Sequence, residues 1–209
     1  DPVALQFAAA GYHTAVLTVQ RGEGAQNYQP LRQLNEALAL LRQNAESGTS
    51  CRIKIGRLRL LGGRTSGLSG AVLNIPGETA QQRPNAVILG YPVITAGEFA
   101  HRGSFVQLAG SEDAAAQQVF TLEDKVTSDT PPVFVWHTME DKTVPVENTL
   151  LLLAALRRAG VPCEAHLFEK GAHGTSISTA EVDAADPHRA HWVALCLEWL
   201  GETFGFKLS

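Results

Sequence analysis

Strand-like and helix-like segments alternate along this chain, and this alternation constrains its fold more than any other feature of the sequence. Apolar runs over 13–19, 86–90 and 133–137 are short and rich in β-branched residues, as strands buried on both faces should be. Leucines between 31 and 41 recur at the spacing of an amphipathic helix. The pattern predicts a doubly wound, mostly parallel sheet with helices on both faces.

The remaining helices and strand are predicted from the spacing of their apolar residues. The terminal helix would place Trp192, Cys196 and Trp199 on one face, because these residues are spaced by four and three positions. The predicted elements are helices over 3–10, 149–159 and 191–200, and an edge strand over 163–168.

Composition favours one packed domain over residues 1–209. Hydrophobic residues make up 44% of the chain and charged residues 18%, which is enough apolar material for a full core. No apolar run reaches the roughly 18 residues that a membrane span needs. The net charge is −4 and the basic residues are scattered, so we expect neither a nucleic-acid partner nor a membrane partner.

The cysteines and the first residue bear on the origin of the chain. Cys51, Cys163 and Cys196 are widely spaced and form no C-x-x-C pair, so we expect buried, reduced thiols and no disulfide framework. Reduced thiols are typical of a cytoplasmic protein. The chain opens on Asp1 and its only methionine is Met139, so we expect a processed product or a fragment.

Two polar loops follow predicted strands, where a parallel sheet places its chemistry. Asp141 follows the strand over 133–137, and His173 follows the strand over 163–168. A carboxylate followed about thirty residues later by a histidine is the acid–base half of a Ser-Asp-His relay. A single loop aspartate is usually a turn former, and a histidine between glycines is usually solvated. The combination favours the catalytic interpretation.

The other histidines are assigned no catalytic role. His13, His137 and His166 lie in or at the ends of predicted strands, and we expect them to be structural. His188 and His191 flank the start of the last helix and have no ligand spacing to a cysteine. No metal site is predicted.

Six further motifs lie at 88–94, 101–104, 108–110, 126–132, 137–148 and 171–174. They resemble the bacterial acetyl-esterase branch of the α/β-hydrolases, which is similar to acetyl-xylan esterases and often labelled xylanase-like. The resemblance covers nearly the whole chain apart from 47–69. It implies that Asp141 is the triad acid and His173 the base, that the substrates are small acyl esters such as acetylated sugars or xylo-oligosaccharides, and that no cofactor is needed.

Two parts of the family pattern are absent from the sequence. An HGGG-like oxyanion loop belongs upstream of the first helix, so the resemblance implies an N-terminally truncated chain and an incomplete fold. The nucleophile elbow, Gly-Phe-Ser-Ala-Gly-Gly, belongs where Leu58-Arg-Leu-Leu-Gly-Gly-Arg-Thr-Ser-Gly67 stands. Lys54, Arg57 and Arg59 interrupt what should be a central apolar strand, and burying an unpaired cation there costs several kcal/mol.

A shift of reading frame accounts for the missing elbow. Codons can be written for Val-Tyr-Gly-Phe-Ser-Ala-Gly-Gly-His-Leu-Ala that, read from the third base, translate to residues 58–67 without a mismatch. The hypothesis is that about 47–68 is a frameshifted segment ended by a compensating shift. The codon of the nucleophile would straddle Leu61 and Gly62.

Ser66 and Ser69 are weak substitutes for the nucleophile. Gly67-Leu-Ser-Gly-Ala71 imitates an elbow, but the family pattern puts Ser69 inside the first turns of a helix and not at the strand–helix turn. Ser104, Ser176 and Ser178 lie in predicted loops and are expected at the surface. We therefore expect a serine ester hydrolase by descent, with little or no activity in this chain.

Two other functions stay open. An oligopeptidase-type serine hydrolase has similar D-x-x-V and G-x-H-G loops, although the segments over 88–94 and 101–104 favour the esterase. A non-catalytic remnant that binds a sugar or a partner would show ligand-induced stabilisation without hydrolysis.

Overall fold

Four strands form one parallel sheet in sequential order, β1-β2-β3-β4. The computed structural model describes residues 1–18, 29–46, 56–59, 84–182 and 184–205. Parallel strands bury both faces, which explains the uninterrupted apolar sequences of the two middle strands. The strands are β1 (Gly56–Arg59), β2 (Ala86–Gly90), β3 (Val133–Thr138) and β4 (Cys163–Phe168).

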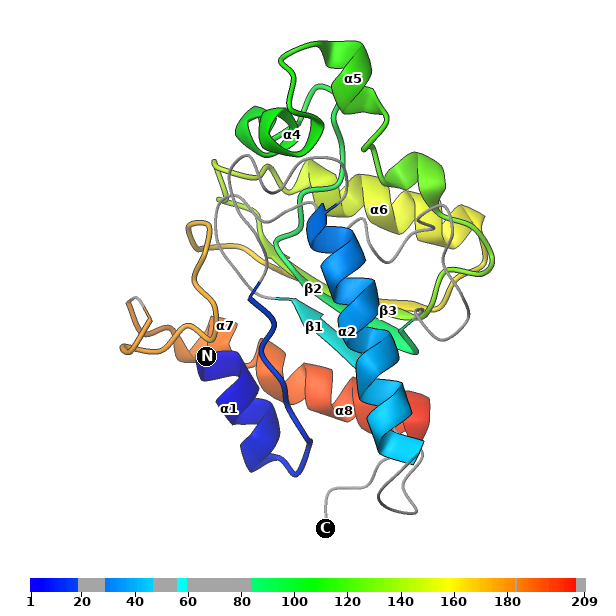
Figure 1. Ribbon diagram of the computed structural model, residues 1–209. Helices are drawn as coiled ribbons and strands as arrows, with labels where there is room; N and C mark the ends of the chain where they lie inside the picture. Colours follow the sequence, from blue (N-terminus) through cyan, green and yellow to red (C-terminus); the bar gives the residue numbers. More distant parts are fainter. Residues whose placement is uncertain (19–28, 47–55, 60–83, 183, 206–209) are drawn as a thin grey trace.

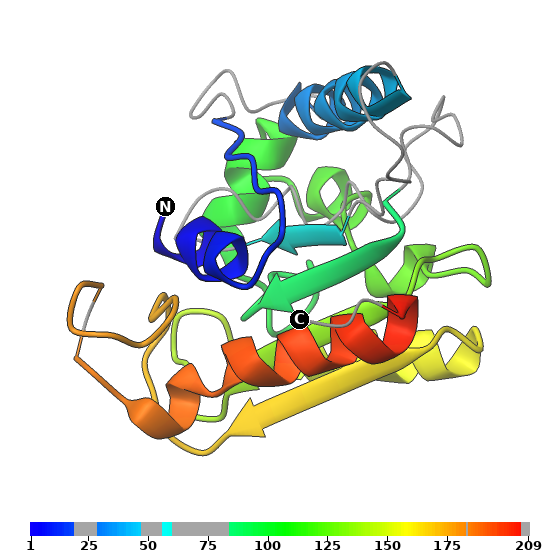
Figure 2. The ribbon, with the colours of Figure 1, turned by 90° about the horizontal axis from the view of Figure 1, so that it is seen from below.

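Helices cover both faces of this sheet, as predicted (Figure 1). Helix α6 (Glu147–Arg158) packs on one face, where Val133 and Val135 of β3 point. Helices α1 (Pro2–Ala9) and α8 (Trp192–Phe204) pack on the other, against Phe134 and Trp136. Figure 2 shows α8 running alongside the strands on its face of the sheet. The alternation along β3 therefore divides the core into two layers.

The remaining helices lie around these two layers. Phe105 of α4 packs against Val144, so α4 covers the loop that follows β3. The leucine-rich helix is confirmed, although only part of its stripe is buried: Leu38 is 3% exposed and Leu41 is 41% exposed. These helices are α2 (Gln29–Glu46), α4 (Arg102–Ala109), α5 (Ala114–Gln118), the 3₁₀ turn η3 (Glu123–Lys125) and α7 (Pro187–Ala190).

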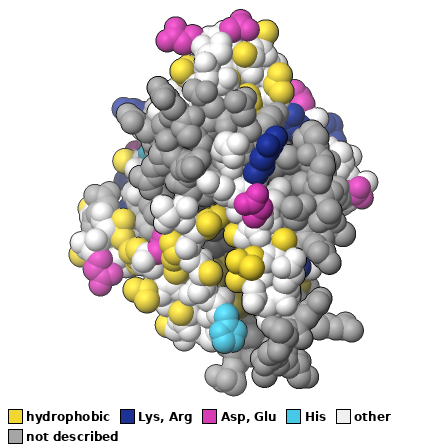
Figure 3. All heavy atoms as spheres, viewed as in Figure 1, with side chains coloured by type: hydrophobic (Ala, Val, Ile, Leu, Met, Phe, Trp, Pro, Cys, Tyr) yellow, Lys and Arg dark blue, Asp and Glu magenta, His cyan; other side chains and the backbone are white. Residues whose placement is uncertain are grey.

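The strand predicted over 13–19 does not form in the described residues. Residues 13–18 are irregular and exposed, with Val16 62% and Leu17 43% accessible, and residue 19 lies outside the description. High β-propensity alone does not make a strand, because its backbone groups need a neighbouring strand to pair with. Figure 3 shows hydrophobic side chains on the face of the molecule that carries α1 and α2.

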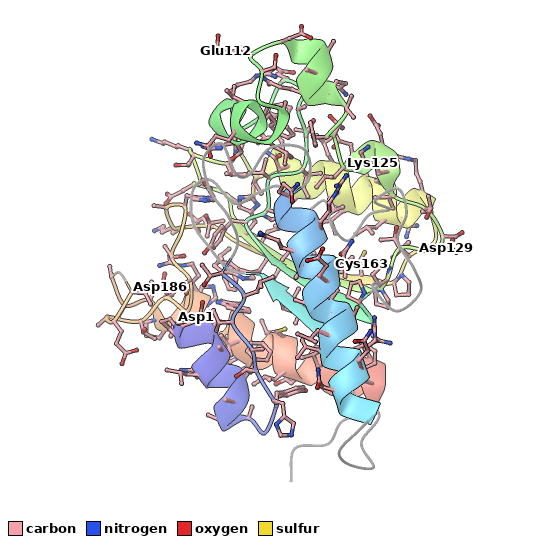
Figure 4. The ribbon with its side chains drawn as sticks, in the orientation of Figure 1. Asp1, Glu112, Lys125, Asp129, Cys163 and Asp186 are labelled. Atoms are coloured by element: carbon pink, nitrogen blue, oxygen red, sulfur yellow. The ribbon has the colours of Figure 1, made fainter. Side chains whose placement is uncertain are left out.

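The edge strand β4 alternates between exposed and half-buried positions, as predicted. Its first residue, Cys163, is exposed, so the expectation that all cysteines are buried is wrong there (Figure 4). Cys196 in α8 is buried, and its burial, together with the nearby Glu164, raises the pKa of the thiol. Cys51 lies outside the described residues.

Candidate active site

The loops after β3 and β4 bring Asp141 and His173 into contact. The Nδ1 atom of His173 lies 2.7 Å from Oδ2 of Asp141. The two strands are paired in parallel, so both of their carboxyl ends lie at the same edge of the sheet. The two residues that the sequence singled out are thus hydrogen-bonded across 32 positions of chain.

The geometry sets the tautomer of His173. A carboxylate only accepts, so Nδ1 carries the proton and donates it to Asp141, which leaves the lone pair of Nε2 for another donor. The His173 side chain is 12% exposed, whereas that of Asp141 is fully buried. The ring of Tyr91 meets the imidazole edge to face, with centroids 4.7 Å apart, and limits its rotation. This orientation is the one that a general base requires.

Asp141 is held by its own loop. Its Oδ1 accepts the backbone N–H groups of Thr143 and Val144, each at 2.9 Å. These two bonds close a tight turn immediately after β3 and aim Oδ2 at His173. The carboxylate is satisfied at both oxygens before any ligand arrives.

A second histidine, His137 at the end of β3, also contacts this carboxylate. Its Nε2 lies 2.9 Å from the carbonyl of Val144 and 3.2 Å from Oδ2 of Asp141. A carbonyl only accepts, so Nε2 of His137 carries a proton and donates to both oxygens. Its Nδ1 lies 2.7 Å from the hydroxyl of Thr149 in α6. The expected structural role of His137 thus extends to positioning the acid.

These contacts decide the charge of Asp141. Burial raises the pKa of its carboxyl, but hydrogen bonds from His137, His173 and the Val144 N–H outweigh burial. The net pKa lies well below the usual value for aspartate. Asp141 is therefore an anion at neutral pH, as a triad acid must be to stabilise an imidazolium.

Asn148, which the sequence analysis did not single out, joins the Asp141 loop to the segment after β2. Its Oδ1 accepts the N–H groups of Ile94 and Thr95 at 2.9 and 3.0 Å. Its Nδ2 donates to the carbonyls of Phe99 and Pro145 at 2.9 and 3.0 Å. All four bonds of one fully buried amide are used, so Asn148 fixes the relative position of the two segments.

His101 lies near the pair at the start of α4. Its Nδ1 is 2.7 Å from the hydroxyl of Ser104. Burial and the neighbouring charge of His173 lower the pKa of His101, and Asp141 partly opposes them. Ser104 is buried in α4, so its predicted surface position is wrong, because it pairs with His101 beneath the segment after β2.

Comparison with known proteins identifies the family of the chain. The model of the prolyl oligopeptidase family matches residues 93–206, a region that contains Asp141 and His173. This match covers more than half of the chain.

The chain belongs to the prolyl oligopeptidase family.

Solved structures are similar to nearly the full chain. An acetyl ester-xyloside bifunctional hydrolase from Caldicellulosiruptor lactoaceticus is 30% identical over 99% of this chain and 76% of its own, with a TM-score of 0.80. A carboxylesterase from Lactobacillus plantarum is 27% identical over 96% of this chain and 78% of its own, with a TM-score of 0.78. The predicted resemblance to acetyl-esterase-like α/β-hydrolases is confirmed.

Two curated relatives each match about half of this chain. Endo-1,4-beta-xylanase B of Butyrivibrio fibrisolvens is 42% identical over 100 residues, which are 47% of this chain and 16% of the xylanase. An acetylxylan esterase of Xylanibacter ruminicola is 33% identical over 103 residues, 46% of this chain and 22% of the esterase. The chain thus spans less than a quarter of the length of either relative.

Four of the serines considered in the sequence remain to be placed. Ser66 and Ser69, the weak candidates for the nucleophile, lie outside the described residues, as does most of the segment 47–69. Ser176 and Ser178 are buried, at 1% and 2% exposure, so their expected surface position is wrong. Their loop folds inward because Trp192 and Arg189 of the C-terminal region bind it.

Histidines elsewhere in the described part of the chain lie apart from this site. His166 pairs with Glu164 on β4 at 2.8 Å, while His13, His188 and His191 are exposed. Within the same described part, no three His, Cys, Asp or Glu side chains are grouped as metal ligands. Nor does any described helix combine the length and the apolar character needed to cross a bilayer.

The charge of Asp141 predicts a pH dependence of stability. Its folded pKa is lower than the unfolded value of about 3.9, so it stabilises the fold above that pH and loses this effect as the pH falls toward the folded pKa. We expect Asp141→Asn to lower the free energy of unfolding by about 2–3 kcal/mol at pH 7 and by less at pH 3. Urea unfolding at the two pH values measures the difference.

Glu112→Gln is the matched control, because Glu112 is an exposed carboxylate between α4 and α5 (Figure 4). We expect it to change stability little at either pH. An equal effect of Asp141→Asn at both pH values would refute the assignment of this pH dependence to Asp141.

Proposed function

We propose that this chain derives from a serine carboxylic-ester hydrolase that acts on small or carbohydrate acetyl esters. The observation that carries the proposal is the hydrogen bond of 2.7 Å between Asp141 and His173 at the edge of a parallel sheet. In the proposed mechanism Nε2 of His173 takes the proton of a serine hydroxyl, and the resulting alkoxide attacks the acyl carbon. Asp141 orients the imidazole and stabilises its positive charge.

The names of the relatives support the substrate class. One solved relative is an acetyl ester-xyloside hydrolase, one curated relative is an acetylxylan esterase, and another is a xylanase. The ester would be a small molecule, and neither nucleic acid nor a membrane is needed for the reaction. Histidine and aspartate suffice as acid and base, so the proposal includes no cofactor.

In this proposal, residues 1–209 are one domain that supplies the acid and the base but not the nucleophile. The aberrant segment over 47–69 stands in place of the elbow. Losing a triad nucleophile removes most of the rate enhancement. Ser66 and Ser69 lack the elbow context and are not proposed as replacements.

The present chain is accordingly expected to hydrolyse p-nitrophenyl acetate no faster than its own His173→Ala variant. The reason is that an imidazole without a neighbouring hydroxyl cannot form an acyl-serine intermediate. Initial rates at pH 8 for both proteins, each checked for folding by circular dichroism, give the comparison. Turnover that falls when His173 is replaced would contradict the proposed impairment and would show that a nucleophile is present.

A second candidate is an oligopeptidase-type hydrolase, which is favoured by the family model over 93–206. The same Asp141–His173 pair would serve an amide substrate, because the acyl chemistry is shared. An aminoacyl-nitroanilide assay beside the ester assay, on a chain whose elbow has been restored, discriminates the two. Hydrolysis of the nitroanilide but not of the acetyl ester would favour the peptidase.

A further inference from the structure

We propose that Arg189 is the positioning residue for His173. Its guanidinium would join the two ends of the loop 170–178 and so hold the imidazole against Asp141. This inference rests on the proposed role of His173 as the base. The measurement given below reports on the imidazole itself, so its failure would be distinct from a failure to find hydrolysis.

Arg189 is buried in α7, just before α8, with 7% of its side chain exposed. Its Nε donates to the hydroxyl of Ser178 at 2.8 Å, and its Nη1 donates to the carbonyl of Lys170 at 3.2 Å. Lys170 precedes His173 by three residues and Ser178 follows it by five. One planar guanidinium therefore binds both flanks of the loop that presents the histidine.

The charge of Arg189 is balanced by Asp186. The Nη1 atom lies 3.0 Å from Oδ2 of Asp186, which also caps α7 by accepting the N–H groups of His188 and Arg189 (Figure 4 labels Asp186). A buried cation without a partner would be strongly destabilising. The pairing with Asp186 lets Arg189 stay charged inside the protein and donate to the loop.

The backbone of the loop needs such support. Ser176 and Ser178 have φ angles of 50° and 53°, a region that residues other than glycine rarely adopt. Gly171 has a φ of 135°, and a Cβ atom there would collide with the guanidinium of Arg189. The loop thus lies close against the guanidinium of Arg189. Strained backbone angles of this kind persist only where surrounding contacts hold them in place.

Further bonds tie the same loop to β3 and α8. The hydroxyl of Thr138 donates to the carbonyl of Gly171 at 2.7 Å, and the indole N–H of Trp192 donates to the carbonyl of Ser176 at 2.9 Å. Each of these bonds holds one flank of the loop, whereas Arg189 alone binds both among the contacts described here. Arg189 is therefore the one described group that joins the two flanks directly to each other.

The test is proton NMR of the ¹⁵N-histidine-labelled chain, which needs no catalytic activity. A Nδ1 proton held by a carboxylate and shielded from water gives a low-field resonance, and the signal of His173 is assigned by its absence in His173→Gln. We expect this resonance in the wild-type chain and in Arg158→Met, which replaces an exposed arginine of α6. We expect Arg189→Met to lose it through exchange with water.

Two further variants keep the test decisive if Arg189→Met does not fold. Ser178→Ala removes the acceptor of Nε and should weaken or broaden the His173 resonance. Arg189→Lys keeps the positive charge but loses the planar guanidinium with its several donors, so the His173 resonance should be absent in this variant too. A folded Ser178→Ala or Arg189→Met protein with a lower melting temperature and an unchanged His173 resonance would overturn the proposal. Arg189 would then stabilise the fold without positioning the base.

Discussion

Restoring the reading frame across residues 47–68 is expected to produce an esterase activity that depends on His173. In the restored chain, His173→Ala should lower kcat/KM for p-nitrophenyl acetate by about 10⁴-fold or more. The reason is that the elbow serine would supply the hydroxyl, while the hydrogen bond from His173 to Asp141 already orients the base. Removing the imidazole leaves the serine without a proton acceptor, and the acylation step then fails.

The matched control is His13→Ala in the same restored chain, because His13 is exposed and lies outside every described helix and strand. We expect kcat/KM to stay within about threefold of the restored parent, as for most surface substitutions away from a site. A restored chain whose rate is the same with and without His173 would disprove its role as the base. Sequencing the locus is an independent check, since an in-frame gene without an indel relative to its nearest relatives would refute the frameshift.

Asn148→Ala is expected to lower the free energy of unfolding by about 3–5 kcal/mol, a large loss for a single substitution. The side-chain amide makes four hydrogen bonds, and its removal leaves the buried N–H groups of Ile94 and Thr95 without their acceptor. It also frees the segment after β2 from the Asp141 loop. Urea unfolding followed by tryptophan fluorescence measures the change.

Asn148→Asp keeps the shape of the side chain and its acceptor oxygen but removes the donor Nδ2. The aspartate keeps the acceptor for Ile94 and Thr95 but places a buried anion against the carbonyls of Phe99 and Pro145, so we expect a loss at pH 7 at least as large as that of Asn148→Ala, and a smaller loss at a pH low enough to protonate the carboxyl. Asn44→Ala is the control, because Asn44 is exposed on α2 and its side chain donates to Leu40. We expect it to change stability by less than about 1 kcal/mol. An equally small effect of Asn148→Ala would show that the amide bridge is not needed.

Much of the sheet could be predicted from sequence, because a buried parallel strand has a pattern of its own. The bounds of β2 and β4 match the predicted ranges 86–90 and 163–168, and β3 extends the predicted 133–137 by one residue. The segment over 13–18 is the exception. Its composition is equally β-rich, but a strand also requires a neighbour, and pairing is not a property of the segment alone.

The contact between Asp141 and His173 could also be anticipated, because both follow adjacent parallel strands. The residues that support them could not. His137, Asn148 and Arg189 are polar residues that face inward, and a sequence pattern gives no direction for a polar side chain outside a regular periodicity. Only the fold shows that Arg189, sixteen positions beyond His173, returns to the loop of the base.

Every hydrogen bond described above for the acid–base pair and its supports comes from residues between 91 and 192. A genetic lesion upstream of that region would therefore silence the enzyme without dismantling the apparatus that the serine would use. Such a gene would retain its ancestral chemistry in latent form. Recovering the nucleophile would take two events, one that restores the reading frame near residue 47 and one that removes the compensating shift near residue 68, because residues 69–209 must stay in frame.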